Sequence, residues 1–397
     1  MDNILVIAKG LEQTRFFLRM QESSYKLGYK IIYITAHYAT YLYLKKRKIK
    51  VYLIKNKYKT LVKLEESEII NSFEYKARFF SKNLIQNLYN ASYIQMQEII
   101  NDNNIKYIFM WNGCQIIDKA TKQIANIQNI KTLYFEIANI NGKTFVDPKG
   151  TNANSQLFDS PEILKQYNVN LNEYNKWKEN YLREKFANHI VKQSYNKYSN
   201  KIGFCINRLG DIFITKFFSM NNLVSKIKEF LLYKTINFKY DNYDYKNRKY
   251  IFFPLQVSND TQILIHSDIG IEKALEFAVI EAKKNNCDLV IKPHPAEKNS
   301  KFVENLLKKK QKEKFYFVNE NTFRLIQNAK LVITINSTVG LETKIMGKTL
   351  KVLGRALYAN FNQYDIAAYI QKYLIDIDYF DNARIDIKIF NKILNLR

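Results

Sequence analysis

Short apolar runs alternate with segments of helical periodicity along this chain, and the alternation limits the folds open to it. In the first part of the sequence, the predicted strands cover residues 3–8, 30–35, 50–54, 105–111 and 131–136. After residue 249, the predicted strands cover residues 250–257, 287–292, 315–318, 331–335 and 349–353. Strands separated by helices form parallel β-α-β units. The sequence therefore predicts an α/β protein with two parallel sheets.

The two alternating stretches predict two Rossmann-like lobes with a segment of different composition between them. A chain of 397 residues is long enough for two domains at about 100–200 residues each. We expect an N-terminal lobe over 1–158, a helical connector over 159–248, and a C-terminal lobe with a helical tail over 249–397. Two such lobes with parallel sheets facing a cleft make up the GT-B architecture, which is the fold class we expect.

The chain is strongly basic, with a formal net charge of +25 at pH 7. A basic surface attracts nucleic acid, phospholipid headgroups, sugar nucleotides and acidic glycans. The basic residues are spread along the sequence, without zinc-finger spacing or an RNP-like signature, so we expect no nucleic-acid partner. Peripheral contact with an anionic membrane surface fits the charge better.

The apolar segments and the cysteines of the sequence indicate the cellular compartment in which we expect the protein. No apolar run reaches the roughly 18 residues that a membrane helix needs. The first residues, MDNILVIAKG, are typical of a strand rather than a signal peptide. Cys114, Cys205 and Cys287 lie far apart with no CxxC pair, which favours structural thiols in a reducing compartment. We expect a cytoplasmic protein, peripheral at the inner face of the cytoplasmic membrane.

Several well-known sites are not indicated. The first strand is not followed by GxGxxG, and the chain has no GxxxxGK[ST], so neither a nicotinamide cofactor nor a P-loop is supported. No HExxH motif or His/Cys cluster indicates zinc. A metal-dependent sugar-nucleotide site of the DxD type is not indicated either. We expect no bound metal and no cofactor.

The first candidate segment, Lys292-Pro-His294-Pro295, directly follows a predicted strand of the second lobe. Ligands of open α/β sheets bind at this edge. The flanking prolines restrict the backbone around His294. A histidine held there can donate to a phosphate or protonate a leaving group, the alternative being a structural histidine.

The second candidate segment runs from Asn336 to Glu342, after the strand predicted at 331–335. Ser337 and Thr338 fall where a helix N-cap belongs, and free N–H groups at a helix start suit a phosphate. Gly340 would allow a ligand to approach closely, and Glu342 can cap the helix or hold a ribose. The alternative is a plain capping motif.

The third candidate segment, Gln256 to Asp260, follows the strand predicted at 250–257. Asp260 can act as a nucleophile or general base, and Gln256 as its polar partner. The alternative is a turn closed by an Asx-type hydrogen bond.

The first lobe carries polar segments that would face the cleft of a two-lobed transferase and bind an acceptor. Asn112 and Glu136 each follow a predicted strand, and Lys149 and Asn152 belong to the turn-rich run 147–155. Surface turns are the alternative for all four residues.

Taken together, these segments resemble a known family. PLQVSNDTQI, KPHPAE and INSTVGLETKIMGKTLKVLG resemble the capsule polysaccharide biosynthesis family, which includes the bacterial β-Kdo transferases. WNG, YFE and DPKGTNANS resemble single-module members that start the capsule linker on a lipid. The resemblance covers residues 105–155 and 250–358.

The resemblance implies a retaining GT-B glycosyltransferase that uses CMP-Kdo as co-substrate. The QxxxD and HP motifs of the family match Gln256, Asp260, His294 and Pro295. By analogy, Asp260 attacks the anomeric carbon and His294 stabilises or protonates the departing phosphate. The implied acceptor is a phosphatidylglycerol-type lipid or a glycan. The residues expected at the nucleotide are Lys292, Pro295, Asn336, Ser337, Thr338, Gly340 and Glu342.

Two rival interpretations remain open beside a Kdo transferase. The chain can be a transferase of the same family with another CMP- or UDP-sugar donor. It can also be a non-catalytic scaffold that works with other capsule-assembly proteins.

Overall fold

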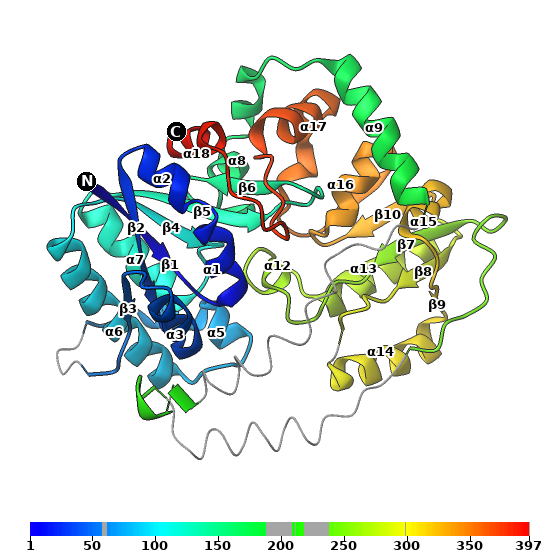
Figure 1. The fold of residues 1–397 in the computed structure, drawn as a ribbon. Coiled ribbons are helices and arrows are strands. Elements are labelled where there is room, and N and C mark those ends of the chain that lie inside the picture. The colour runs from blue at the N-terminus through cyan, green and yellow to red at the C-terminus, as the bar shows by residue number, and fades with distance from the viewer. Residues whose placement is uncertain (58–61, 188–208, 211, 218–237, 298, 397) are drawn as a thin grey trace. The chain divides into compact units, whose positions relative to one another are not determined.

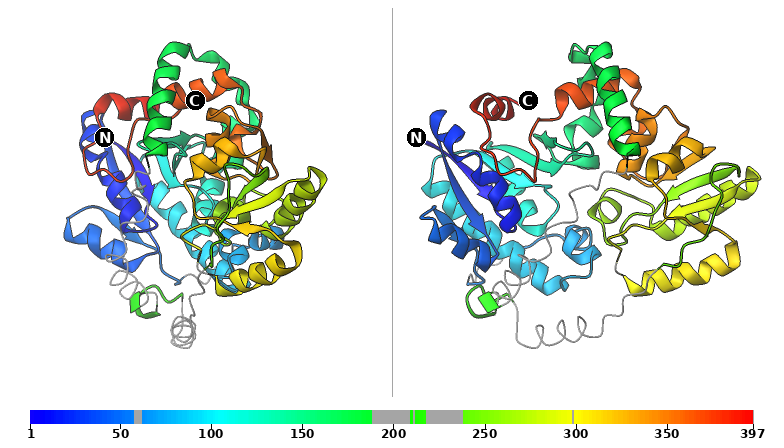
Figure 2. Two further views of the ribbon diagram at one scale, coloured as in Figure 1. Left: turned by 90° about the vertical axis from the view of Figure 1, so that its right-hand side faces the viewer. Right: turned by 45° about the vertical axis from the view of Figure 1, so that its right-hand side comes forward.

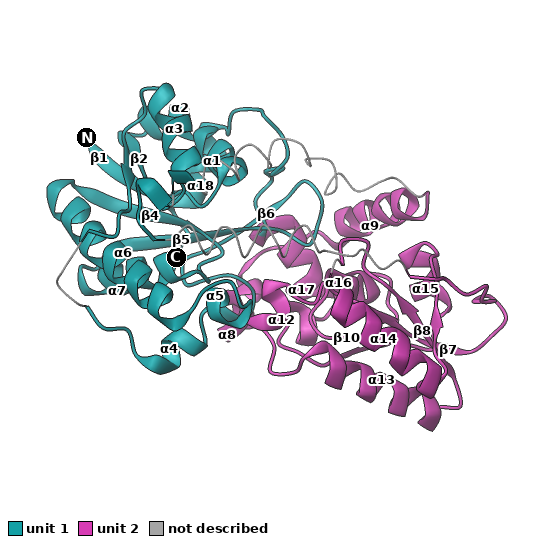
Figure 3. Ribbon diagram, turned by 90° about the horizontal axis from the view of Figure 1, so that it is seen from below, with its two compact units in different colours: residues 1–156, 191–229, 374–397 teal, residues 157–190, 230–373 magenta. Residues whose placement is uncertain are grey.

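The computed structural model describes residues 1–57, 62–187, 209–210, 212–217, 238–297 and 299–396. Contacts divide the chain into two compact units, shown in different colours in Figure 3. Unit 1 contains residues 1–156, 191–229 and 374–397, and unit 2 contains residues 157–190 and 230–373.

Unit 1 is built on a six-stranded sheet with the order β3-β2-β1-β4-β5-β6. Its strands are β1 (Asp2–Ile7), β2 (Tyr29–Thr35), β3 (Val51–Leu53), β4 (Ile105–Trp111), β5 (Lys131–Ile137) and β6 (Thr144–Asp147). All neighbours pair in parallel except β5 and β6, which are antiparallel. The chain leaves β1 toward β2 and returns on its other side at β4, so the switch in strand order lies between β1 and β4.

Helices cover both faces of the unit 1 sheet, as Figures 1 and 2 show. The helices of unit 1 are α1 (Leu11–Leu18), α2 (Gln21–Lys26), α3 (Tyr38–Lys46), α4 (Glu66–Ile70), α5 (Phe73–Lys76), α6 (Lys82–Asp102), α7 (Ile116–Ile127) and α18 (Ile387–Leu394), of which α4 and α5 pack on α6. Alternate strand residues point to opposite faces. Ile4 and Val6 therefore pack with α1, α3 and α18, whereas Leu5 and Ile7 pack with α6 and α7.

Unit 2 is built on a fully parallel five-stranded sheet with the order β11-β10-β7-β8-β9. Its strands are β7 (Tyr250–Pro254), β8 (Asp288–Lys292), β9 (Tyr316–Phe317), β10 (Leu331–Thr334) and β11 (Leu350–Val352). Ile251 and Phe253 pack in one core with α13, and Tyr250 and Phe252 in a second core on the other face. The switch in strand order lies between β7 and β10.

The helices of unit 2 include a long one from the segment expected to be a connector. The unit contains η2 (Pro161–Gln166), α9 (Leu171–Phe186), α12 (Thr261–Leu264), α13 (Ile271–Lys284), α14 (Ser300–Glu313), α15 (Thr322–Asn328), α16 (Thr338–Ile345), η4 (Leu357–Asn360), α17 (Gln363–Ala368) and the π-helix η5 (Tyr369–Tyr373). The short element η1 (Asn152–Asn154) belongs to unit 1, and α8 (Gln156–Asp159) spans the sequence boundary between the units. The expected α/β class with two parallel-rich sheets is confirmed.

The residue ranges of the two compact units differ from the expected domain bounds. The tail from Leu374 onward belongs to unit 1, because Ile375 bridges Thr144 and Phe390 packs in the unit 1 core. Residues 157–190, of which 157–158 were expected in the N-terminal lobe and the rest in the connector, belong to unit 2, where α9 contacts α15 and α17. Much of the expected connector lies outside the described residues.

Two helical regions of unit 1 are interrupted. A break at residues 19–20 separates α1 from α2. The helices α4, α5 and α6 are separate elements, and residues 58–61 before them lie outside the described part. Ser81 caps α6 by accepting from the Leu84 N–H, which starts a new helix after α5.

Two other expectations concern membrane helices and thiols. In the ranges that the structure describes, no helix is both long and apolar enough to cross a membrane. Cys114 is buried, which raises the pKa of its thiol to about 12. Cys287 is a half-buried free thiol, and Cys205 lies outside the described residues.

The docking of α18 predicts a stability effect at the end of the chain. Phe390 is fully buried and lies 6.3 Å from the Phe109 ring. Phe390→Ala should lower the free energy of unfolding by about 3–5 kcal/mol, because it leaves a cavity in the unit 1 core. Urea unfolding measures the change. Lys388→Ala, on the exposed side of the same helix, is the control, and equal effects of the two variants would contradict this packing.

Candidate functional site

Three neighbouring strands of unit 2, β10, β7 and β8, end at one edge of the sheet and lead into the three polar segments singled out in the sequence. Pro254 at the end of β7 pairs with Lys292 at the end of β8. The switch between β7 and β10 is the place where open α/β sheets bind ligands. The structure thus brings the Gln256, His294 and Ser337 segments to one edge.

Gln256 and Asn336 bind each other across this switch point. Gln256 Nε2 donates to Asn336 Oδ1 at 3.0 Å, and the Asn336 backbone N–H donates to Gln256 Oε1 at 3.3 Å. Asn336 Nδ2 also donates to the carbonyl oxygens of Gln262 (2.6 Å) and His266 (3.0 Å). Each of the two residues is 7% exposed. Their amides hold the loop after β7 against the end of β10, which is a positioning role.

Glu297 forms a second bridge, between the loops after β7 and β8. Its carboxylate accepts from the Ser258 backbone N–H at 2.6 Å and the Ser258 hydroxyl at 3.2 Å. It also accepts from the Asn299 N–H at 2.7 Å. The sequence analysis did not select Glu297, although it lies three residues after His294. An acidic residue just before a helix start was the available signal.

Asp260 is the N-cap of α12, and its Oδ1 accepts from the Gln262 N–H at 2.9 Å. The Asx-type hydrogen bond weighed as the alternative is therefore present. Among the described residues, no donor is recorded for Asp260 Oδ2. Burial raises the pKa of Asp260, opposed by the Gln262 hydrogen bond and by the charge of His294. Asp260 thus lies within electrostatic reach of His294.

His294 is exposed at the end of β8, and its ring is oriented by the backbone. The Ala296 N–H donates to Nδ1 at 3.1 Å, so the proton of the neutral ring lies on Nε2. Although the side chain is exposed, partial desolvation by the surrounding loops lowers the pKa of His294, and the charges of Asp260 and Glu297 oppose the shift. At neutral pH the ring is therefore an uncharged donor through Nε2. Pro295 follows it on the exposed surface.

Ser337 is the N-cap of α16, as the sequence predicted. Its Oγ accepts from the Val339 N–H at 3.2 Å, and its carbonyl accepts from the Gly340 N–H at 2.9 Å. Thr338, the first helical residue, is exposed. Its N–H and hydroxyl are the groups of this helix start that remain best placed for a ligand.

Gly340 is small for a reason other than ligand approach. A Cβ built there would lie 2.4 Å from the hydroxyl oxygen of Tyr358 and 2.6 Å from its ring. Tyr358 is 2% exposed and donates to the Ser337 carbonyl. Gly340 therefore makes room for the tyrosine that fixes the start of α16, which differs from the role expected for it.

Glu342 and Lys292 are both engaged within unit 2. Glu342 Oε1 accepts from the Tyr181 hydroxyl at 3.3 Å and lies 3.7 Å from Lys185 Nζ, both on α9. Burial raises the pKa of Glu342. Lys292 Nζ donates to the Glu320 carbonyl at 2.6 Å and to Thr322 Oγ1 at 3.0 Å. The sequence did not reveal that α9 supplies the partners of Glu342.

The predicted acceptor residues all lie in unit 1, at the ends of β4 and β5 and in the loop after β6. The Thr151 hydroxyl donates to the Asn112 carbonyl at 3.0 Å, which joins the WNG and DPKG segments. Asn112 and Asn152 have positive φ values of 48° and 52°. Glu136 is half-buried and Lys149 is exposed.

Asp147 holds the loop after β6 in place and was not selected from the sequence. Its Oδ1 accepts from the backbone N–H groups of Lys149 (2.8 Å), Gly150 (3.1 Å) and Gln156 (3.0 Å). A fully buried carboxylate that accepts several backbone N–H groups fixes a turn. Asp147 therefore positions Lys149 and Asn152.

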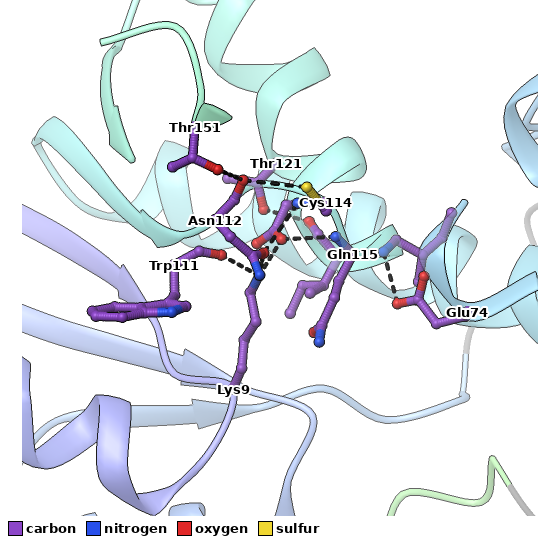
Figure 4. A network of polar contacts seen from close by, with 11 residues as sticks. Lys9, Glu74, Trp111, Asn112, Cys114, Gln115, Thr121 and Thr151 are labelled. Carbon is purple, nitrogen blue, oxygen red and sulfur yellow. Dashed lines mark hydrogen bonds and ion pairs between the residues drawn. The ribbon is translucent and has the colours of Figure 1, made fainter. Parts of the chain in front are cut away.

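A buried lysine lies at the switch point of the unit 1 sheet, as Figure 4 shows. Lys9, after β1, donates to Asp118 on α7, to the Trp111 carbonyl and to Asn112 Oδ1. The side chains of Lys9 and Asp118 are 4% and 0% exposed. Glu74 lies beside them and accepts from the Ile116 N–H at 2.9 Å. Burial raises the pKa of Glu74 and of Asp118, with Lys9 opposing both shifts.

The fold and the polar edges define an α/β protein with two Rossmann-like units, each with side chains gathered at its strand-order switch. A model of the family described as capsule polysaccharide biosynthesis protein matches residues 106–361, more than half of the chain. The chain belongs to this family.

Two curated proteins show the extent of the sequence likeness. The capsule polysaccharide export protein KpsS of Escherichia coli is 35% identical over 123 residues, covering 28% of this chain and 31% of KpsS. Protein FixF of Sinorhizobium fredii is 36% identical over 114 residues, covering 28% of this chain and 27% of FixF. The alignments thus span less than a third of each relative.

Among solved structures, the β-Kdo 2,7 transferase of Thermosulfurimonas dismutans KpsC gives a TM-score of 0.47 at 13% identity. That match covers 100% of this chain and 98% of the other. The β-Kdo 2,4 transferase of the same KpsC gives 0.42 at 15% identity, covering 74% and 88%.

The Lys9–Asp118 pair predicts a coupled stability effect. Lys9→Met leaves a buried carboxylate without its counter-charge and should lower the free energy of unfolding by about 3–5 kcal/mol. Asp118→Asn should also destabilise, and the double variant should lose less than the sum of the single losses. Chemical denaturation of the four proteins measures the coupling.

The control is Lys119→Met on the same helix, which removes a more exposed pair with Glu68. That change should alter the free energy of unfolding by no more than about 1 kcal/mol. Strict additivity of the two single changes at Lys9 and Asp118 would contradict the coupling.

Proposed function

We propose that the chain is a glycosyltransferase that moves a sugar from a nucleotide sugar to a lipid or glycan acceptor. The observation that carries the proposal is that the Asp260 and His294 segments follow the paired ends of β7 and β8 at one sheet edge, next to β10, which leads into α16. Membership of the capsule polysaccharide biosynthesis family supports it. The resemblance of the QxxxD and HP segments to β-Kdo transferases favours CMP-Kdo as the donor, used as a co-substrate.

The proposed chemistry is a double displacement at the anomeric carbon. The Asp260 carboxylate forms a bond to that carbon while the bond to the CMP phosphate oxygen breaks, and CMP leaves. The acceptor hydroxyl then attacks the same carbon and gives its proton to solvent water, while the bond from that carbon to the carboxylate oxygen breaks and the Asp260 carboxylate is released. Two inversions give net retention of configuration. Asp260 Oδ2 is the oxygen suited to the attack, since Oδ1 already accepts from Gln262.

His294 acts in this scheme as a hydrogen-bond donor rather than as an acid. Its lowered pKa keeps the ring neutral at pH 7, and the Ala296 N–H keeps the proton on Nε2. A phosphate monoester is an adequate leaving group once its charge is stabilised, so protonation by histidine and a metal ion are both dispensable. Thr338 at the start of α16 would bind the same phosphate.

The other expected ligands take more distant roles. We assign the acceptor to Asn112, Glu136, Lys149 and Asn152 of unit 1. Glu342 and Lys292 support the shape of the nucleotide site, because each is engaged by neighbouring side chains or carbonyls. An anionic membrane surface at the inner face of the cytoplasmic membrane, and other capsule-assembly proteins, are proposed partners that fit the net charge of +25.

Asp260→Asn and His294→Ala test the proposal directly. Asp260→Asn should lower transfer by about 10³-fold or more, because the amide cannot form the glycosyl ester. His294→Ala should lower kcat by about 10²–10³-fold through loss of one donor to the leaving group. Purified protein, CMP-Kdo and a lipid acceptor are incubated, and the product is measured by mass spectrometry.

Glu272→Gln, an exposed carboxylate on α13, is the matched control and should retain full transfer. Full activity of a folded Asp260→Asn or His294→Ala variant would remove that residue from catalysis. A thermal shift with UDP but not CMP would point to another donor, and no shift with CMP, UDP or GDP would point to a scaffold.

The pKa of Asp260 predicts the acid limb of the pH profile. An aspartate must be ionised to act as a nucleophile, and burial raises its pKa above the ordinary value of about 3.9. Transfer should therefore be constant near neutral pH and fall on acidification, with a midpoint above that value. Single-turnover rates across the acidic range measure it, with unfolding followed in parallel. A midpoint at or below the ordinary value would contradict an ionised Asp260 nucleophile.

A further inference from the structure

A groove of about 570 Å³ lies in unit 1. Its walls are the helix α2, the start of β2, and the end of α3 with the loop that leads into β3. The residues that line it are Gln21, Ser24, Tyr25, Tyr29, Lys30, Ile31, Lys45, Lys48, Ile49 and Lys50. Lys30 and the loop before β3 lie at the amino ends of their strands, whereas Lys9 and Asn112 follow the carboxyl ends of β1 and β4. The groove is therefore at the edge of the sheet opposite Asn112.

The lining carries four lysines, and no Asp or Glu is among its residues. Lys30, Lys45, Lys48 and Lys50 are all exposed, and in the described part of the chain none of them forms an ion pair with a carboxylate. Lys50 donates to the neutral amide oxygen of Asn103 at 2.7 Å. Positive charges gathered in one groove repel one another, so an anion bound there would relieve the repulsion.

Helix geometry explains only part of this cluster. Lys45 lies in the last turn of α3, where a cation stabilises the helix dipole. Lys30 belongs to β2, and Lys48 and Lys50 belong to the loop that precedes β3. No helix end requires these three lysines, yet the fold directs them to the same groove from two different segments.

Aromatic and aliphatic side chains complete the lining. Tyr25 is 71% exposed, an unusual position for a large aromatic ring, and Tyr29 is half-buried next to it. Ile31 is buried and Ile49 is half-buried. Lysines in one concavity with the exposed ring of Tyr25 and the half-buried ring of Tyr29 suit a ligand that has both anionic groups and apolar faces.

We propose that this groove binds an acidic glycan, with its carboxylates at the lysines and its sugar rings against Tyr25 and Tyr29. The concave shape favours a saccharide chain over a bilayer, because a flat membrane surface contacts protruding lysines rather than the interior of a groove. A chain held at this edge lies across the sheet from Asn112 and Asn152, so the groove would retain a glycan without occupying the proposed acceptor site. The inference goes beyond the proposed transfer reaction and does not depend on it.

The experiment measures glycan binding by calorimetry in the absence of any sugar donor. The probes are an oligogalacturonate, whose sugars each carry a carboxylate, and a malto-oligosaccharide of equal length without charge. The groove variant replaces four lysines by glutamine at Lys30, Lys45, Lys48 and Lys50. The control variant removes the same charge from unit 2 at the exposed Lys284, Lys301, Lys308 and Lys330.

We expect the oligogalacturonate to bind the unmodified protein and the malto-oligosaccharide not to bind. The groove variant should lose about tenfold or more in affinity, and the control variant should be unchanged within about twofold. Tyr25→Ala, which keeps the net charge, should also weaken binding of the glycan. Thermal unfolding of each variant confirms that it is folded.

Three results would overturn the proposal. They are equal weakening in the two quadruple variants, no binding of the oligogalacturonate, and binding only to vesicles of phosphatidylcholine with phosphatidylglycerol, lost in the groove variant. The last result would identify a membrane contact instead. Transfer activity is assayed separately, so a failure of the groove and a failure of the proposed reaction are distinguishable.

Discussion

The reciprocal amide contact between Gln256 and Asn336 fixes the geometry on which the candidate site depends. It lies at the switch between β7 and β10. The two residues form two hydrogen bonds with each other, and Asn336 donates two more to backbone carbonyls of the same buried cluster. Removing the partner of a buried amide lowers the free energy of unfolding by about 1–3 kcal/mol. The segment from Gln256 to His266 therefore has one favoured position. Asp260 lies inside that segment, and its placement follows from the contact.

The loop after β8 is fixed from the other side. Glu297 accepts from Ser258 and from Asn299, so the His294 turn and the Asp260 segment share a common anchor. His294 is further oriented by the Ala296 N–H. In the proposed reaction, Asp260 and His294 are held by residues that do not themselves react, which would preorganise them for chemistry. The cost of ordering them is met during folding rather than at the moment of reaction.

Structural features that depend on local sequence patterns were predicted correctly. Strand positions followed from apolar runs, and the N-cap at Ser337 followed from a polar residue between a strand and a helix. Partners remote in sequence were missed, because nothing near Gln256 indicates that Asn336, 80 residues later, satisfies its amide. The contacts of Gly340 with Tyr358 and of Glu342 with α9 were not predicted for the same reason, because both partners are remote in the sequence.

The C-terminal tail illustrates a second limit. The pattern of α18 shows an apolar face, but periodicity does not say which core will bury it, and the tail packs on unit 1 rather than on the sheet that precedes it. Net charge is a similarly limited predictor, because the total of +25 includes lysines with different roles in the structure. Lys9 is buried and neutralised by Asp118, where it supports the backbone at Trp111. Lys30 and Lys48 are exposed and unneutralised by any described carboxylate, so they attract anions from solution. Burial and partners, rather than the sum of charges, separate a structural lysine from one that binds a ligand.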